Sequence, residues 1–258
     1  AYDRVEWKFL DSMMAKMGFG TVWRQWIWSC LTSVTYSFNI NGEPKEFVIP
    51  ERGIRQGDPL SPYLFLLCSE GFSNLLKQAE GNKRISGMKI SRNGPSITHL
   101  FFADDSLIFC NAEREEACEL IQILRRYEMG SGQSINLEKS SVFFSSNVDY
   151  QRRREVRQSL GTIQVATQGR YLGLPMVITR SKQQVFGYIK DSISRRMASW
   201  KNKLLSQGGK EVLLKAVSMA MPVYTMSCFK LPNKLCKEVS SMFANYWWGE
   251  TEGKNKMH

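Results

Sequence analysis

The sequence predicts an α+β fold over its first two thirds and an all-helical end. Apolar residues recur at helical spacing in several segments and alternate with polar residues in others, with turn residues between them. Beyond residue 181 only the helical spacing remains. The 258 residues, 43% of them hydrophobic, have a globular composition and the length of one large domain or two small ones.

The first predicted elements are two helices and a β-hairpin. A helix is expected over 5–17, because its apolar residues share helical spacing and Gly18 follows. The hairpin is centred on Asn41-Gly42, which supplies the chemistry of a two-residue turn. The second helix, between them, is expected to carry Trp23, Trp26, Ile27, Cys30 and Leu31.

A loop over 52–62 is expected to lead into a buried helix that continues to about Leu76. Ser61 suits its N-cap and Pro62 its first position. Farther on, apolar runs on both sides of Asp104-Asp105 predict two buried strands joined by a tight turn.

Helices dominate the rest of the chain. The next helix is expected to be capped by Asn111 and to end at Gly130. Later segments follow in order: a strand over 135–144, a basic helix over 150–160, a short strand or turn over 171–175, a helix after 181, a break at 208–209, and helices over 210–221 and 232–248.

Charge separates the two halves of the chain. Residues 131–258 hold 20 Lys and Arg against 8 Asp and Glu, whereas residues 1–130 hold 15 against 16. A basic surface of this kind favours a polyanion such as nucleic acid. A basic surface that only faces solvent explains the same counts equally well.

Cysteine and histidine usage exclude several classes of protein. The six cysteines include no C-x-x-C pair and no Asn-x-Ser/Thr sequon occurs, so we expect an intracellular protein that is not secreted. No apolar run reaches the ~20 residues of a membrane span, so no membrane partner is expected. The one internal histidine, His99, lies on a predicted strand and is read as structural, which leaves zinc sites and Ser-His-Asp catalysis without support.

The strongest chemical signal is the Asp104-Asp105 pair. Adjacent carboxylates repel each other unless a cation neutralises them, and two-metal phosphoryl transfer uses such carboxylates. The alternative is that aspartate is simply a common turn residue. The loop before the buried helix offers a second candidate, because Gln56 can hydrogen-bond a base or sugar beside the flexible Gly57, although an ordinary connection explains it as well.

Five segments taken in order resemble reverse transcriptases, and most nearly those of plant non-LTR (LINE-type) retrotransposons. They are A-Y-D-R-V (1–5), R-G-I-R-Q-G-D-P-L-S-P (52–62), F-A-D-D (102–105), G-Q-S-I-N-L-E-K-S (132–140) and Y-L-G (171–173). The resemblance implies a right-hand polymerase palm, an antiparallel sheet packed on helices, with partial fingers over 1–178. It implies a basic, thumb-like helical region over 179–258.

The resemblance also implies an RNA-directed DNA polymerase that uses an RNA template, a DNA primer, deoxynucleotides and two Mg²⁺ ions. Its oligomeric state is left open. Asp104 and Asp105 match the family's metal-binding turn, and Lys139 matches a lysine that assists pyrophosphate departure. Further matches are substrate-binding Tyr2, Arg55, Gln56 and Gly57, and the primer-gripping Tyr171, Leu172 and Gly173.

One feature of the family is expected to lie outside this sequence. The family's first metal-binding aspartate precedes the A-[F/Y]-D segment, and that segment starts at Ala1 here. The polypeptide is therefore expected to be incomplete, with low activity by itself. Two alternatives remain: a catalytically inactive, nucleic-acid-binding relic of a retrotransposon, and a metal-dependent phosphohydrolase that uses the same aspartates.

Overall fold

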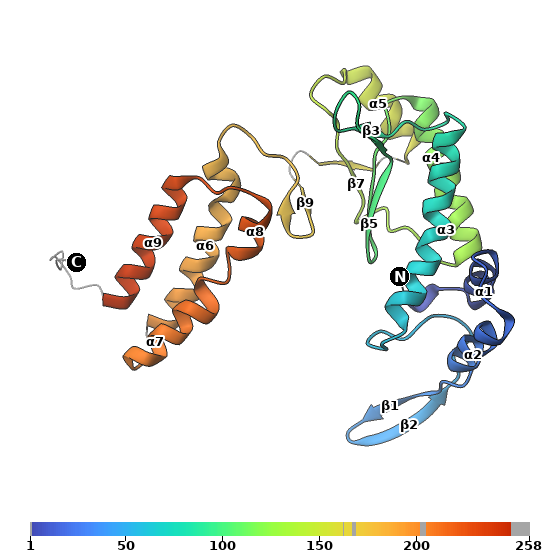
Figure 1. The fold of residues 1–258 in the computed structure, drawn as a ribbon, viewed down its shortest axis with the longest axis horizontal. Coiled ribbons are helices and arrows are strands. Elements are labelled where there is room, and N and C mark those ends of the chain that lie inside the picture. Colours follow the sequence, from blue (N-terminus) through green and yellow to red (C-terminus); the bar gives the residue numbers. More distant parts are fainter. Residues whose placement is uncertain (1, 162, 167–168, 202–204, 249–258) are drawn as a thin grey trace. The chain divides into compact units, whose positions relative to one another are not determined.

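The computed structural model describes residues 2–161, 163–166, 169–201 and 205–248, and it divides the chain into two compact units, 1–166 and 167–258. Unit 1 mixes helices with short strands, and unit 2 is largely helical (Figure 1). This architecture confirms the predicted α+β class. None of the described helices combines the length and apolar content that crossing a membrane requires.

Unit 1 begins with a short turn, two helices and a hairpin. These are η1 (Tyr2–Arg4), α1 (Trp7–Lys16), α2 (Thr21–Thr32), β1 (Tyr36–Ile40) and β2 (Glu43–Val48). Leu10 and Met14 of α1 pack with Ile27 of α2 in a small core. Both helices and the hairpin were predicted, and Asn41 and Gly42 adopt the positive φ angles of 56° and 89° that a two-residue turn requires.

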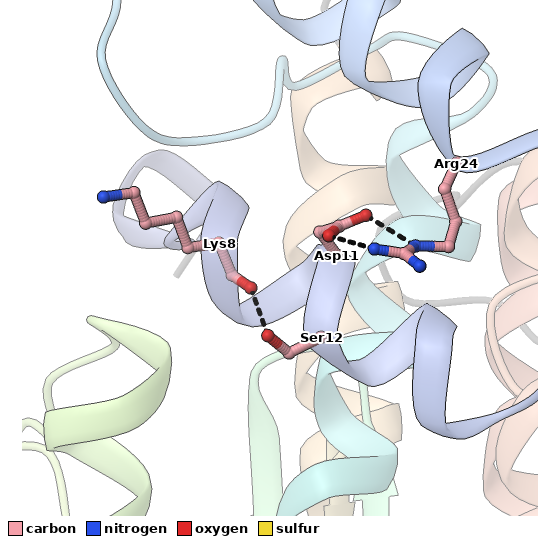
Figure 2. A network of polar contacts seen from close by, with 4 residues as sticks. All are labelled: Lys8, Asp11, Ser12 and Arg24. Carbon is pink, nitrogen blue, oxygen red and sulfur yellow. Dashed lines mark hydrogen bonds and ion pairs between the residues drawn. The ribbon is translucent and has the colours of Figure 1, made fainter. Parts of the chain in front are cut away.

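An ion pair joins the first two helices (Figure 2). Arg24 of α2 donates from Nε to Oδ1 of Asp11 on α1 at 2.8 Å and from Nη2 to Oδ2. These hydrogen bonds lower the pKa of the Asp11 carboxyl and raise that of the Arg24 guanidinium. Within α1, the Ser12 hydroxyl donates to the Lys8 carbonyl at 2.8 Å. The bidentate contact links α2 to α1.

The main core of unit 1 lies between two long helices and a third, shorter helix. These are α3 (Ser61–Gly81), α4 (Arg114–Ser131) and α5 (Tyr150–Ser159). Phe72 and Tyr127 stack at 4.8 Å between the first two, and Val156 packs α5 against them. The buried helix and the basic helix of the sequence prediction are α3 and α5.

Among the described residues the strands form five separate two-stranded pairs, four antiparallel and one parallel. In unit 1 these strands are β1 and β2, β3 (Met88–Lys89) with β4 (Ser96–Ile97), β5 (His99–Phe102) with β6 (Asp105–Ile108), and β7 (Ser141–Val142) with β8 (Gln164–Val165). The β5–β6 pair was predicted, but its arms are only half buried: Phe101 and Ile108 pack against the core while Leu100 and Phe102 are exposed.

Two helix starts differ from the prediction. Helix α3 has Leu60 rather than Ser61 as its N-cap, because the Asp58 side chain already receives the Leu60 amide at 2.8 Å. Helix α4 has Glu113 as its N-cap. The Asn111 amide and side chain instead donate to the buried Glu116 carboxylate, which draws the chain back onto the first turn of α4.

The predicted strand over 135–144 is wrong except at β7. Asn136 accepts the Lys139 amide through Oδ1 at 3.1 Å, and its carbonyl accepts the Ser140 hydroxyl at 2.7 Å. A side chain that bonds its own backbone competes with a strand ladder, so the chain turns here. Helix α4 also continues through Gly130 to Ser131, and its C-cap is Gly132, whose φ is 73°.

Unit 2 is a hairpin followed by packed helices. Its elements are β9 (Arg170–Tyr171), β10 (Leu174–Pro175), α6 (Lys182–Lys201), α7 (Gln207–Leu213), the π-helical turn η2 (Leu214–Ser218), α8 (Val223–Cys228) and α9 (Asn233–Trp248). Phe186, Ile193 and Trp200 of α6 pack with Leu235 of α9 in the core of this unit. The predicted break at 208–209 is wrong, since the Ser206 hydroxyl caps the Gly209 amide and starts α7 there.

The hairpin before α6 belongs to unit 2. The Tyr224 hydroxyl of α8 donates to the Leu172 carbonyl at 3.0 Å, and the Arg170 guanidinium lies 4.2 Å from the centre of the Tyr188 ring on α6. These contacts explain why the structural division falls after Ala166 and not after Ile178. Whether the units are a palm and a thumb stays a prediction.

Candidate functional site

The N-terminal turn η1 holds Tyr2 against the start of α3. The Tyr2 ring stacks on Phe65 with centroids 4.7 Å apart and planes inclined by 10°. Its carbonyl accepts the Ile54 amide at 3.0 Å, so both ends of the residue are fixed. Tyr2 remains half buried, with part of its surface available to a ligand.

Two parts of the chain about fifty residues apart are bonded side by side at this point. The Gly53 amide donates to the Val5 carbonyl at 2.8 Å, and the Trp7 indole donates to the Gly53 carbonyl at 2.6 Å. Gly53 has φ of 88°, and a Cβ there would lie 2.8 Å from the Asp3 carbonyl oxygen. Only glycine allows this approach, so the loop after β2 is held on the N-terminal segment.

A tight turn over Arg55–Asp58 follows. Gly57 occupies its third position with φ of 87°, the left-handed conformation that such a turn requires, and the Asp58 amide lies 3.4 Å from the Arg55 carbonyl. Gln56 is exposed at the second position, where its amide can reach a ligand. The turn thus presents Gln56 and Gly57 on the surface beside Tyr2.

The β5–β6 turn presents the two predicted metal ligands. Phe102 pairs with Asp105 across it, leaving Ala103 and Asp104 at the tip. Asp104 and Asp105 are both exposed, and Ala103 has φ of 50°. A left-handed alanine costs roughly 1–2 kcal/mol, so the turn is strained next to its carboxylates.

These elements meet at a pocket of about 440 Å³. It is lined by Tyr2, Gln56, Gly57, Asp58, Pro62 and Asp104. Four of these residues were singled out in the sequence. The structure therefore gathers three separate segments, 2–7, 52–62 and 102–105, around one opening.

Asp58 and Pro62 line the pocket, but no role was assigned to them from the sequence. Asp58 Oδ1 accepts the Leu60 amide, so this carboxylate supports the turn into α3. The signal that could have revealed them was the run D-P-L-S-P, which places two rigid prolines just after the Gln56-Gly57 turn.

The carboxylates fit a magnesium ion whose coordination shell is completed by a bound substrate. Within the part of the chain that the structure describes, no group of three or more His, Cys, Asp or Glu side chains is arranged to hold a metal. Mg²⁺ is commonly held by one or two carboxylates together with substrate phosphates and water. Asp104, with Asp105 beside it, offers such an oxygen donor set to a phosphate-bearing ligand.

Other predicted site residues lie outside the pocket lining. Asp105 and Arg55 are exposed and stand next in sequence to the lining residues Asp104 and Gln56. Lys139 is exposed on the turn that Asn136 stabilises. Tyr171, Leu172 and Gly173 belong to unit 2. Leu172 and Gly173 form the β9–β10 turn, with φ angles of 51° and 78°.

His99 is a structural residue, as predicted. Its Nε2 lies 2.9 Å from the buried Ser73 hydroxyl, and its Nδ1 lies 2.9 Å from the buried Thr98 hydroxyl. Burial is the main cause that lowers the pKa of the His99 imidazole. Both ring nitrogens are occupied, so His99 is not placed as a general base for the pocket.

Comparison with known proteins points to one family. Residues 1–176 match the family described as "Reverse transcriptase (RNA-dependent DNA polymerase)". An "Uncharacterized mitochondrial protein" of Arabidopsis thaliana is 55% identical over 69 residues, 27% of this chain. A "Putative ribonuclease H protein" of the same plant is 35% identical over 85 residues, 33% of this chain.

A "Transposon TX1 uncharacterized 149 kDa protein" of Xenopus laevis is 23% identical over 259 aligned positions, which cover 96% of this chain. The matched segments make up 57%, 14% and 19% of these three relatives, in the order given. The chain therefore spans less than two thirds of each relative.

Proposed function

Because the chain belongs to the reverse transcriptase (RNA-dependent DNA polymerase) family, we propose that the pocket beside Asp104 is where it joins a deoxynucleotide to a primer on an RNA template. In this reaction the primer 3′-oxygen attacks the α-phosphorus of the nucleotide. The new O–P bond forms as the bond to the pyrophosphate oxygen breaks, and the attacking hydroxyl loses its proton.

Asp104 and Asp105 are the residues that we propose hold Mg²⁺. When bound, two such ions supply charge stabilisation to the attacking and leaving oxygens. The carboxylates are exposed at a short hairpin tip, so the phosphates of an incoming nucleotide can complete the coordination. The left-handed Ala103 fixes the direction in which the tip presents them.

Tyr2, Gln56 and Gly57 are proposed to bind the nucleotide. Tyr2 is held flat on Phe65, so its position is preorganised to exclude a ribose 2′-hydroxyl by steric contact. The Gln56 amide is placed to hydrogen-bond a base or sugar, and the absent side chain of Gly57 leaves room for it. Arg55, exposed beside them, offers a guanidinium to phosphate oxygens.

The remaining roles follow the resemblance. We propose that Lys139 donates a proton to the departing pyrophosphate and that the turn at Tyr171, Leu172 and Gly173 grips the primer end. Residues 1–178 would be partial fingers and palm, and 179–258 a thumb. Unlike the pocket residues, these assignments rest on sequence position alone.

One observation carries the proposal: Tyr2, Gln56, Gly57 and Asp104 come from three distant segments and line the same pocket. The test is primer extension on an RNA template with Mg²⁺ or Mn²⁺, comparing the chain with Asp104→Asn and Glu43→Gln. Glu43 is the matched control, because it is an exposed carboxylate at the tip of the β1–β2 hairpin.

We expect Asp104→Asn to reduce incorporation about a thousandfold or more, since bound metal supplies several kcal/mol and each 1.36 kcal/mol is tenfold in rate. Glu43→Gln should extend primers at the rate of the unaltered chain. Measurable extension at equal rates by Asp104→Asn and the unaltered chain would remove the β5–β6 turn from the mechanism.

A binding module without catalysis is the second candidate, and the basic excess of residues 131–258 favours it. In that case the chain binds nucleic acid with affinity that falls steeply with salt, and no nucleotide is incorporated under any metal condition. Binding measured beside primer extension separates the two functions.

A further inference from the structure

Helix α5 carries a positive charge that the polymerase chemistry does not use. Four of its ten residues are arginines, and Val156 is its buried residue, seated in the core formed with α3 and α4. The helix therefore packs by one face, and the charged face opposite is left to solvent.

Three residues of α5, called the stripe below, lie along one side of the helix: Tyr150, Arg154 and Arg157. They stand at positions i, i+4 and i+7, which places them along one side of a helix, about 6 Å and 4.5 Å apart along its axis. The Tyr150 side chain is 81% exposed, and Arg154 is exposed as well. Arg157 is half buried at the edge of the stripe.

The other two arginines of α5 stabilise the start of the helix and the loop before it. Arg152 pairs with Asp149 at 3.5 Å, next to the side-chain cap that starts the helix. Arg153 donates to the Val148 and Ser145 carbonyls and lies 5.9 Å from the centre of the Phe144 ring, which fixes the preceding loop.

The stripe arginines have no such partners. Within the described part of the chain neither Arg154 nor Arg157 forms an ion pair, and the Arg157 Nε is buried without a hydrogen-bond acceptor. Of the acids on or next to α5, Asp149 pairs with Arg152 and Glu155 accepts from the neutral Gln151 amide. Neither of these acids forms an ion pair with Arg154 or Arg157.

The stripe is also remote from the pocket. The pocket lies at the start of α3, whereas α5 packs on α4 near the other end of α3 (Figure 1). A helix the length of α3 spans roughly 30 Å. A ligand on the stripe therefore occupies a different place from a nucleotide in the pocket.

We propose that Tyr150, Arg154 and Arg157 bind a segment of single-stranded nucleic acid outside the polymerase pocket. Guanidinium groups suit phosphate oxygens, and an exposed tyrosine ring offers a face on which an unpaired base stacks. A duplex keeps its bases stacked on one another, so a lone ring favours a single strand. Two guanidinium groups on one side of a helix favour a polyanion. The proposal does not depend on the role given to Asp104.

The test is binding of a labelled single-stranded RNA, measured by fluorescence anisotropy on the whole chain in EDTA without nucleotides. EDTA removes metal-dependent binding at the pocket. The variants are Arg154→Gln, Tyr150→Ala and Tyr150→Phe, with Arg152→Gln as the control on the same helix. Thermal unfolding of each variant shows whether α5 remains folded, and the exposure of Tyr150 and Arg154 makes unfolding unexpected.

We expect Arg154→Gln and Tyr150→Ala each to weaken binding about fivefold or more, and Tyr150→Phe to bind like the unaltered chain because its ring still stacks. Arg154→Gln should also lower the slope of log K against log salt by about 0.7, the loss of one phosphate contact to a single strand. Arg152→Gln should change binding less than twofold.

Equal losses in Arg152→Gln and Arg154→Gln would overturn the proposal, because a diffuse positive field would then explain binding. Unchanged binding in Arg154→Gln and Tyr150→Ala would also overturn it. An acidic protein would then be the remaining candidate partner of the stripe. Neither result affects the primer-extension test of Asp104, so failure of one proposal is distinguishable from failure of the other.

Discussion

The wall of the pocket and the β1–β2 hairpin are neighbours in sequence but are held in opposite ways. The wall, made of residues 2–7 and 52–58, is fixed by long-range hydrogen bonds, and no side chain fits at Gly53. Every residue of β1 and β2 is exposed, and a Cβ at Gly42 would meet nothing within 4 Å. The hairpin is thus specified by its own turn residues, and the wall by contacts between distant segments.

The largest expected difference is between Gly53→Ala and Gly42→Ala. Their φ angles are 88° and 89°, so the backbone penalty is shared, but only Gly53 also faces a clash with Asp3. We expect Gly53→Ala to cost about 2–4 kcal/mol of unfolding free energy and Gly42→Ala about 1 kcal/mol. Urea unfolding of unit 1 measures both. Equal costs would show that the wall is no tighter than the hairpin.

A second contrast concerns two aromatic rings. Tyr2 stacks on Phe65, whereas the Phe47 side chain of β2 is 79% exposed. Tyr2→Ala should lower the unfolding free energy by about 1–2 kcal/mol and Phe47→Ala by about 0.5 kcal/mol or less. Unfolding midpoints compare the two, and a larger loss for Phe47→Ala would indicate that the Phe47 ring packs on another element.

Features set by local sequence were predictable, and features set by contacts between distant segments were not. Helices α1 and α6 and the Asn41-Gly42 turn were predicted because spacing and turn chemistry are local properties. The contact of Gly53 with Val5 was not predictable, since nothing within either segment specifies its partner. The resemblance selected Tyr2, Gln56, Gly57 and Asp104, but their meeting in one pocket required the fold.

The failures of prediction have local causes that spacing does not reveal. The segment around Asn136 has strand-like composition, yet the Asn136 side chain stabilises a turn. Gly208 and Gly209 were read as a break, yet Ser206 caps a helix that includes them. In both places hydrogen bonds of one polar side chain stabilise a backbone conformation that the apolar spacing does not indicate.

A third prediction concerns the two hairpin turns. Ala103 at the pocket has φ of 50°, whereas the corresponding turn of β1–β2 uses Asn41 and Gly42, which tolerate positive φ. Ala103→Gly should therefore raise the unfolding free energy by about 0.5–1 kcal/mol. Because the tip becomes less restrained, primer extension should fall. A stabilised variant with faster extension would argue against a functional strain in this turn.

The smallest expected effect is a local response to mild acid. The lowered pKa of His99 means that the folded state binds its proton more weakly than the unfolded state does. The stabilisation is therefore complete above the ordinary value of 6.5 and is lost as pH falls through the window below it. Lys77, Glu70 and Glu80 are the charged groups that act on the imidazole.

Hydrogen exchange at pH 7.5 and 5.5 measures this response, with intrinsic rates taken into account. Protection should decrease over 99–108 and stay constant over 36–48, which contains no histidine. In His99→Gln the decrease over 99–108 should disappear. An equal loss of protection in both hairpins would attribute the effect to the whole unit and not to His99.

In the proposed site, Asp104 holds a divalent cation beside a nucleotide in the pocket. Electron paramagnetic resonance of Mn²⁺, titrated into the chain with a non-hydrolysable deoxynucleotide triphosphate, tests it without requiring turnover. We expect Asp104→Asn to weaken protein-dependent Mn²⁺ binding at least about tenfold while Glu43→Gln leaves it unchanged. Identical Mn²⁺ binding by Asp104→Asn and the unaltered chain would contradict the claim.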